Sequence, residues 1–370
     1  MRCPSSILAF VLAASSPAYA NKPLPKGLTI SFKDGVLYAA RDGLVVPLLD
    51  DETALQAAVG DFNGAELRDD GESIVVHAST CGGDYIAVRM VTVDARFENL
   101  RGMRAHLEKK YDDAIVHFSA AVAGDNQNVY VTNLLSAQSL GKHFDDADRT
   151  IAKYGPRSRA WFAWRLAVDP DLAALRGRAS AKPYVGATTT KLAVAALGRD
   201  DVAVSPLGFV ATHEWLAWGG PGAPDAYDLA LYTLGGADDP LRLPAIPLAL
   251  TCGGMGQSCT KAEDAKRAAS MHKLDGVLSG LGFEKRATTW VDVLGNDAKV
   301  VTSPDKGTTV TIGDAGVTVK RGKTSVDVAI DGRLLRIGFA GDLVVIRIRE
   351  GFVPCDGDAQ RSYSKIVQLK

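Results

Sequence analysis

The sequence has no excess of charge of either sign and no long apolar segment. Lys and Arg together number 42, and Asp and Glu together number 43. A protein that binds nucleic acid in general needs a strong basic field that displaces counterions, so this balance excludes that class of function. The sequence also lacks any apolar run of the ~20 residues that a transmembrane helix needs. We therefore expect neither a nucleic-acid partner nor a membrane-spanning segment.

Recognisable catalytic motifs are also missing. His213-Glu214 begins like a zinc-protease motif, but Ala217 occupies the position of the second histidine. Gly322-Lys323-Thr324 resembles the end of a phosphate-binding loop, without the first glycine of that loop. The histidines are scattered and form no pair at the i, i+4 spacing that would suit a metal on a helix. The sequence therefore predicts no catalytic residue, no metal site and no cofactor.

The first 20 residues have the features of a secretory signal peptide. Arg2 gives a positive N-terminal region, Ile7–Ala14 forms an apolar stretch, and Ala18-Tyr19-Ala20 has the pattern that signal peptidase recognises. The apolar stretch is too short to span a membrane as a helix. We therefore expect cleavage after Ala20 and a mature protein that is periplasmic or secreted.

Cysteine is rare, and its number suits an exported protein. Of the five cysteines, Cys3 would leave with the signal peptide, so four would remain. An even number of cysteines in an oxidising compartment suggests disulfide bonds, and four cysteines allow three pairings. The local pairing joins Cys252 to Cys259 across a glycine-rich segment. It would leave Cys81 to pair with Cys355.

Alternating residues and turn signals indicate a β-rich region near the N-terminus. The segments Leu28–Phe32, Val36–Ala39 and Leu44–Val46 are separated by Asp-Gly pairs, which are a strong hairpin signal. A further hairpin is predicted from Glu72–His77 and Tyr85–Val93.

A second β-rich region is predicted from Val185 onward, where the period of two residues returns. One helix near residues 260–282 interrupts it, beginning with a plausible capping box. The predicted strands are Asp201–Val204, Gly208–Trp218, Tyr227–Leu234, Thr308–Ile312, Val317–Lys320, Ser325–Ile330, Leu334–Phe339 and Leu343–Ile348. Such an antiparallel meander is compatible with a sandwich, a barrel or part of a propeller.

Between the two β-rich regions the apolar period changes to three and four residues, which predicts amphipathic helices from Ala95. The segment Tyr111-Asp-Asp-Ala114 returns 33 residues later as Phe144-Asp-Asp-Ala147. A period of about 34 residues is typical of tetratricopeptide repeats, in which each unit is a pair of antiparallel helices. Residues 96–184 therefore resemble two such repeats followed by a closing helical segment.

The resemblance is carried by small and aromatic residues. The first unit matches the repeat pattern at Gly102, Ala114, Phe118 and Ala121. The second unit keeps alanines at 137 and 147 but has Leu135 in place of the glycine. Small residues let two helices approach closely, and an aromatic ring fills the groove between them.

Together these patterns predict an α+β multidomain protein in which antiparallel β-rich regions flank a helical module. The expected order is a signal peptide at 1–20, a β-rich domain at 21–95, the repeat-like helical module at 96–184 and a β-rich domain at 185–370.

Three aromatic residues on the closing helical segment are the candidate binding residues: Trp161, Phe162 and Trp164. Tryptophans often supply much of the binding energy of an interface, although packing in the core is the alternative for these three. The resemblance implies a non-enzymatic scaffold that binds a protein or peptide of the cell envelope. The competing hypothesis is an envelope hydrolase whose site lies on β loops without a recognisable motif. Converging carboxylates with shifted pKa values would favour the hydrolase.

Overall fold

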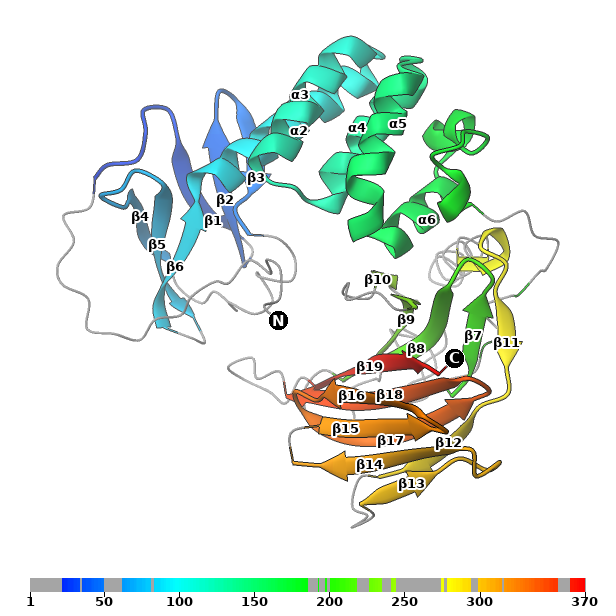
Figure 1. Ribbon diagram of the computed structural model, residues 1–370. Helices are drawn as coiled ribbons and strands as arrows, with labels where there is room; N and C mark the ends of the chain where they lie inside the picture. Colours follow the sequence, from blue (N-terminus) through cyan, green and yellow to red (C-terminus); the bar gives the residue numbers. More distant parts are fainter. Residues whose placement is uncertain are drawn as a thin grey trace, which may run out of the picture. The chain divides into compact units, whose positions relative to one another are not determined.

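The computed structural model of the protein describes residues 22–33, 35–49, 62–80, 83–185, 192, 197, 200–217, 226–234, 241–243, 274–275, 278–293, 299–314, 316–351 and 360–369. Helices and antiparallel sheets both occur in these ranges, which confirms the predicted α+β class. The chain divides into two compact units, Met1–Ala147 and Asp148–Lys370 (Figure 1). The predicted signal peptide, all the cysteines and most of the predicted helix near 260–282 lie outside the described residues.

The first unit begins with two antiparallel sheets of three strands each. One sheet contains β1 (Thr29–Lys33), β2 (Val36–Arg41) and β3 (Leu44–Pro47), and the other contains β4 (Phe62–Leu67), β5 (Ser73–Thr80) and β6 (Gly83–Arg89). Alternate residues of both sheets, such as Leu37 and Ile74, are buried in one shared hydrophobic core. The hairpins predicted for this region are confirmed.

Four helices follow these sheets: α2 (Met90–Leu107), α3 (Tyr111–Gly124), α4 (Asn128–Leu140) and α5 (Phe144–Tyr154). The first of them begins at Met90, so the end of the strand predicted at Tyr85–Val93 is helical instead. Val93 and Phe97 of this helix are fully buried and belong to the same core as the two sheets. Tertiary packing of the helix therefore overrides the strand-like local pattern.

The second unit begins in α5 and continues with short helical segments. These are η1 (Gly155–Arg157), α6 (Arg159–Val168), η2 (Pro170–Leu175) and η3 (Lys182–Tyr184). Asp169 caps η2, because its carboxylate accepts a hydrogen bond from the backbone N–H of Asp171. The buried side chains of Leu166 and Leu172 hold α6 and η2 together.

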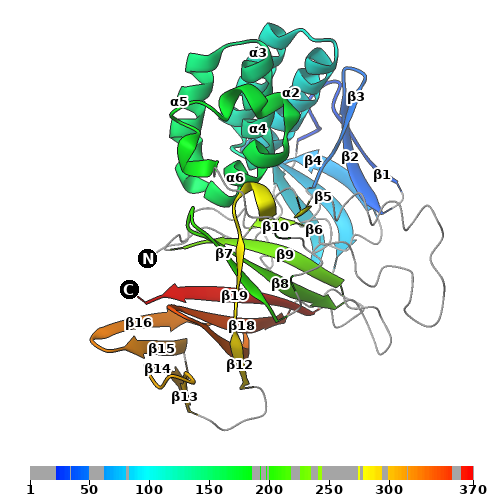
Figure 2. The same ribbon diagram turned by 90° about the vertical axis from the view of Figure 1, so that its right-hand side faces the viewer.

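Most of the remaining described residues of the second unit form two antiparallel sheets (Figure 2). The nine-stranded sheet has the order β10 (Leu241–Leu243), β9 (Ala226–Thr233), β8 (Phe209–Ala217), β19 (Gln360–Gln368), β18 (Leu343–Gly351), β17 (Arg333–Ala340) and β12 (Thr289–Asp292), and β7 (Val202–Ser205) pairs with both β8 and β11 (Glu284–Arg286). The four-stranded sheet has the order β13 (Val300–Thr302), β14 (Thr308–Gly313), β15 (Gly316–Arg321) and β16 (Thr324–Ala329).

The four-stranded sheet packs on one face of the nine-stranded sheet. Val310 and Val319 from the smaller sheet share a core with Ile337 and Ile346 from β17 and β18. This layering is that of a sandwich. The opposite face of β17 and β18 carries a second core that includes Val345. No helix in the described ranges has the length and apolar character to cross a bilayer.

Candidate functional site

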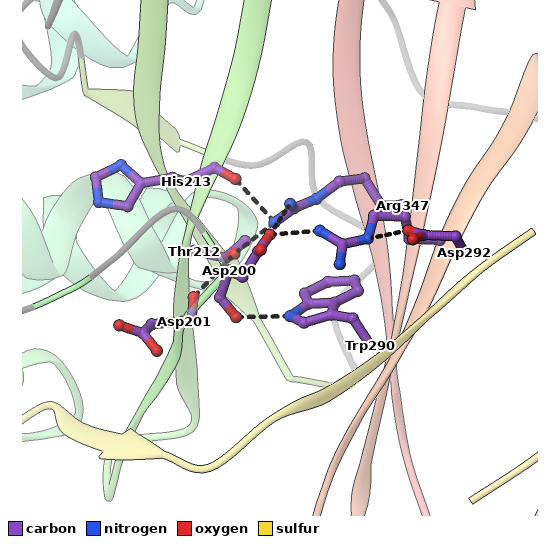
Figure 3. Close-up of polar contacts among 8 residues, drawn as sticks. Asp200, Asp201, Thr212, His213, Trp290, Asp292 and Arg347 are labelled. Atoms are coloured by element: carbon purple, nitrogen blue, oxygen red, sulfur yellow. Dashed lines mark hydrogen bonds and ion pairs between the residues drawn. The ribbon is translucent and has the colours of Figure 1, made fainter. Parts of the chain in front are cut away.

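A cluster of charged residues lies on the second face of the nine-stranded sheet, around Arg347 of β18 (Figure 3). Arg347 is a buried residue, with 8% of its surface exposed. Its Nη2 donates hydrogen bonds to Oγ1 of Thr212, at 3.1 Å, and to the backbone oxygen of His213, at 3.0 Å. A buried arginine needs such acceptors, because the desolvation of an unpaired guanidinium costs several kcal/mol.

The Arg347 side chain donates a hydrogen bond to a backbone oxygen of β8 that has no partner strand beside it in the described part of the chain. Strand β19 pairs with β8 only at Gln360 and Arg361, which lie opposite Ala217 and Leu216. Beyond that point the two strands separate, and Arg347 satisfies the carbonyl of His213 in the gap. The residues that fill this gap, which we name the β8–β19 seam, are Thr212, His213, Glu214, Tyr232, Arg347 and Ser364.

The indole ring of Trp290, on β12, packs against the guanidinium groups of two arginines. Its register partner on β17 is Gly338, where a Cβ atom would lie only 3.0 Å from the indole ring. The guanidinium carbons of Arg347 and Arg336 lie 4.5 and 5.1 Å from the centroid of this ring. Each contact is a cation–π interaction, worth about 0.5–2 kcal/mol. The glycine therefore leaves room for an aromatic platform under two cations.

Two aspartates balance the charge of the two arginines. Oδ1 of Asp200 lies 2.6 Å from Nη1 of Arg336 and 3.6 Å from Nη1 of Arg347. Oδ1 of Asp292 lies 2.6 Å from Nε of Arg336. The indole N–H of Trp290 donates to the backbone oxygen of Asp200 at 2.6 Å, which fixes the start of β7. This part of the cluster carries no net charge.

The buried carboxylate of Glu214 lies two residues after Thr212 on β8. Glu214 is 2% exposed, and it accepts hydrogen bonds from the hydroxyl of Tyr232 and from Nε of Arg242, the latter at 3.1 Å. The same hydroxyl accepts a hydrogen bond from the backbone N–H of Ser364 at 2.7 Å. Tyr232 therefore bridges β9 and β19 through the seam.

Shifted pKa values occur elsewhere in the described part of the chain. Burial tends to raise the pKa of Glu98, but hydrogen bonds from His117 and Arg101 bring it below its usual value. Hydrogen bonds from Arg178 lower the pKa of Asp148. Hydrogen bonds from Ser303 and from the backbone of Gly307 lower that of Asp305. Partners within the protein stabilise the ionised form of all three carboxylates. Glu98 and Asp148 are in ion pairs with arginines, and Asp305 accepts hydrogen bonds within a turn.

The three predicted aromatic residues lie on α6 and separate into two environments. Phe162 is 1% exposed and its ring contacts that of Tyr184, so it belongs to the core. Trp161 and Trp164 are partly exposed, and their rings meet edge to face at 5.0 Å between centroids. Within the described residues, Nε1 of Trp161 is buried without a hydrogen-bond acceptor. The structure thus brings the two tryptophans together and directs Phe162 away from them.

No sequence motif indicates the β8–β19 seam. His213 and Glu214 stood out only as the start of an incomplete zinc-protease motif, and alternation along β8 places their side chains on opposite faces. Nε2 of His213 lies 3.0 Å from the backbone oxygen of Leu197. No group of three potential metal ligands occurs in the part of the chain that the structure describes.

Comparisons with known proteins identify no relative. No family model, no curated protein and no solved structure matches the chain.

Proposed function

We propose that this chain is an exported, non-enzymatic scaffold that binds a protein or peptide partner of the cell envelope. The binding surface belongs to the helical module at residues 96–184, which we interpret as two tetratricopeptide-like repeats. Export is inferred from residues 1–20, which have the three parts of a cleavable signal peptide.

Close packing between α2 and α3 supports the repeat interpretation. A Cβ atom at Gly102 would lie 2.6 Å from the ring of Phe118, so the glycine is required for the observed approach of the two helices. Ala114 and Ala147, which occupy equivalent positions in the repeated segment, are both fully buried. The first turns of α3 and α5 each carry two aspartates. Three of the four are exposed, namely Asp112, Asp113 and Asp145, and Asp146 is half-buried.

The observation that carries the proposal is a contact between the first helices of consecutive units, α2 and α4. Nδ2 of Asn133 on α4 donates to Oδ1 of Asn99 on α2 at 2.9 Å, and the two residues are 34 positions apart. In stacked helical repeats each unit contacts its neighbour through equivalent elements, and the stack offers an extended surface for a partner. Two partly exposed asparagine side chains on this surface would supply donors and acceptors for a peptide backbone.

Site-specific photocrosslinking tests the proposal. A photoreactive amino acid is placed at Asn133 of the mature protein, which is then mixed with an envelope extract of the source cells. Val45 of β3, which is 57% exposed, carries the same amino acid in the control variant. We expect a discrete adduct from position 133 and none from position 45, with the partner identified by mass spectrometry. Equal labelling at both positions, or none at position 133, contradicts the proposal.

The aromatic pair on α6 gives a second variant. Trp164→Ala removes half of the edge-to-face pair at a partly exposed position and should weaken binding of the captured partner. Binding that is unchanged by Trp164→Ala removes this helix from the interface without affecting the proposal for α2 and α4.

A further inference from the structure

The segment 148–184, which is the part of the helical module that belongs to the second unit, is strongly basic. It contains eight Lys and Arg residues and three Asp residues, a net charge of +5, whereas the whole chain carries −1. All three carboxylates already interact within the protein: Asp148 with Arg178, Asp169 with Arg165, and Asp171 with a further group. The acidic groups of this segment therefore do not balance its remaining positive charges.

Two of these cations, Lys153 and Arg157, meet at the ring of Tyr154, where α5 ends. Nζ of Lys153 lies 4.8 Å from the ring centroid, and the guanidinium carbon of Arg157 lies 5.2 Å from it. The two charged groups are therefore at most 10.0 Å apart, which is the sum of these two distances. Both residues are exposed, and neither forms an ion pair with any residue that the structure describes.

The sequence at the end of α5 explains why both cations reach one ring. A Cβ atom at Gly155 would clash with the hydroxyl of the buried Tyr184, so glycine is needed where the chain leaves the helix. Pro156 lacks the N–H of a continued helix, and the chain bends through η1 instead. Arg157, at the end of η1, returns to the ring that Lys153 contacts from the last turn of α5.

Stabilisation of the helix end accounts for only one of the two cations. A basic side chain in the last turn of a helix interacts favourably with the carbonyl groups there, and Lys153 has that position. Arg157 comes after the last residue of α5, in a separate short turn. Two like charges this close repel each other, and an anion beside both of them would remove the repulsion.

We propose that Lys153, Tyr154 and Arg157 bind an extended acidic segment of the partner, with the carboxylates of alternate residues on the two cations. This inference rests on the proposed function, because it names the chemistry of the protein or peptide partner proposed there. Alternate residues of an extended peptide project from the same side and are about 6.6–6.8 Å apart. This spacing suits two cations that are separated by no more than 10.0 Å.

A membrane surface suits this site less well than an acidic peptide. Binding in the membrane interface requires apolar side chains that can insert among the lipids. None of the large apolar residues in the described segment 148–185 is exposed; each is buried or half-buried. Charge is therefore the main feature that the site offers to a ligand.

Fluorescence anisotropy of a labelled peptide that alternates glutamate and serine tests the site on the mature, full-length protein. We expect Lys153→Gln/Arg157→Gln to bind this peptide at least about threefold more weakly than the parent, as the loss of two exposed ion pairs predicts. The matched control, Lys320→Gln/Lys323→Gln, removes two charges from exposed positions of the β15–β16 hairpin and should bind like the parent. Tyr154→Leu keeps both charges but removes the ring that positions them, so it should also weaken binding.

Two further conditions show whether charge drives the binding. A peptide with glutamine in place of glutamate should not bind the parent. Raising the ionic strength to about 0.15 M should weaken binding of the glutamate peptide, because exposed charges are then screened over about 8 Å.

Several results would overturn the acidic-segment site. They are a parent that does not bind the glutamate peptide, a double variant or Tyr154→Leu that binds it like the parent, and a control that loses as much affinity as the double variant. Dependence on the two cations for sedimentation with phosphatidylglycerol vesicles, but not for peptide binding, would assign the site to a membrane surface instead. Photocrosslinking from Asn133 is measured separately, so failure of this site is distinguished from failure of the proposed function. Far-ultraviolet circular dichroism of each variant shows whether the fold is retained.

Discussion

Replacing Gly102 by alanine sets two opposing effects against each other in α2. In an ordinary helix interior, alanine is more favourable than glycine by about 1 kcal/mol. At this position, however, the new methyl group would lie 2.6 Å from Cδ1 and Cε1 of Phe118, well inside van der Waals contact. Phe118 is fully buried, so its ring can move only by displacing other residues of a close-packed core. Overpacking of this kind costs about 1–3 kcal/mol, so we expect a net loss of about 1 kcal/mol.

A double-mutant cycle with Phe118→Leu measures the contact itself. Leucine removes the ring that meets the new methyl group, so Phe118→Leu should cost less in the Gly102→Ala background than in the parent. The difference should be at least about 1 kcal/mol, within the range seen for residues in contact. Urea denaturation followed by far-ultraviolet circular dichroism gives all four free energies of unfolding. A Gly102→Ala variant that is more stable than the parent by about 1 kcal/mol, or a cycle without coupling, would refute the close approach of α2 and α3.

Three further predictions concern other parts of the chain. The mature protein exported by its host should begin at Asn21, and an intact mass that still includes residues 1–20 would remove the basis for its proposed location. Cys252 and Cys259 should form a disulfide bond, which peptide mapping without reductant would show; two free thiols there contradict it. Hydrogen bonds from Arg178 lower the pKa of Asp148, so the ionised carboxylate stabilises the fold above its unfolded pKa, and this stabilisation disappears as the pH falls through the folded pKa. The melting temperature of Asp148→Asn should therefore fall less than that of the parent between neutral and acidic pH. Equal decreases would mean that the pair of Asp148 and Arg178 contributes nothing to stability.

The turns of the β-rich regions could be predicted because their chemistry is local. Asp42 and Gly43 both have positive φ angles, 53° and 72°, as the tight hairpin between β2 and β3 requires. Asp-Gly is a pair that tolerates this conformation, so its presence between alternating segments was sufficient. The later strands of the four-stranded sheet followed for the same reason.

Several of the described strands were not predicted, and β4 and β19 illustrate the reason. β4 contains Gly64 at φ +133° together with a register shift, and both features break the alternation that marks a strand. β19 carries polar residues on both faces, because Ser362 and Ser364 are buried beside the seam instead of facing water. β4 pairs with the next strand along the chain, β5, whereas β19 pairs with β18 and also with β8, which is remote in sequence.

The seam and the arginine cluster could not be predicted, because register assembles them. Asp200 and Arg336 are 136 residues apart. The opposition of Arg336 to Arg347 follows the register of the hairpin between Ala340 and Leu343, and one inserted residue between Leu334 and Arg336 then changes the register of the rest of β17. Shifting that register by one residue would send the arginines to the other face, into the core that contains Ile337 and Ile346. Nothing in the local pattern of either strand specifies this insertion.

The separation of β8 from β19 explains why Tyr232 has to be a tyrosine. Its hydroxyl donates to the buried Glu214 carboxylate and accepts from the backbone N–H of Ser364, so Tyr232→Phe leaves both groups short of a partner. Each such loss costs about 1–3 kcal/mol in a buried site, and we expect a total loss of roughly 2–4 kcal/mol in the free energy of unfolding.

Tyr363→Phe is the matched control for this change. The Tyr363 hydroxyl donates to the backbone oxygen of Asp331, which lies in an exposed turn where water can replace the hydroxyl. Its loss should therefore cost less than about 1 kcal/mol. If chemical denaturation shows equal losses for the two variants, the Tyr232 hydroxyl does not bridge the seam, and another group must satisfy Glu214 and the Ser364 backbone.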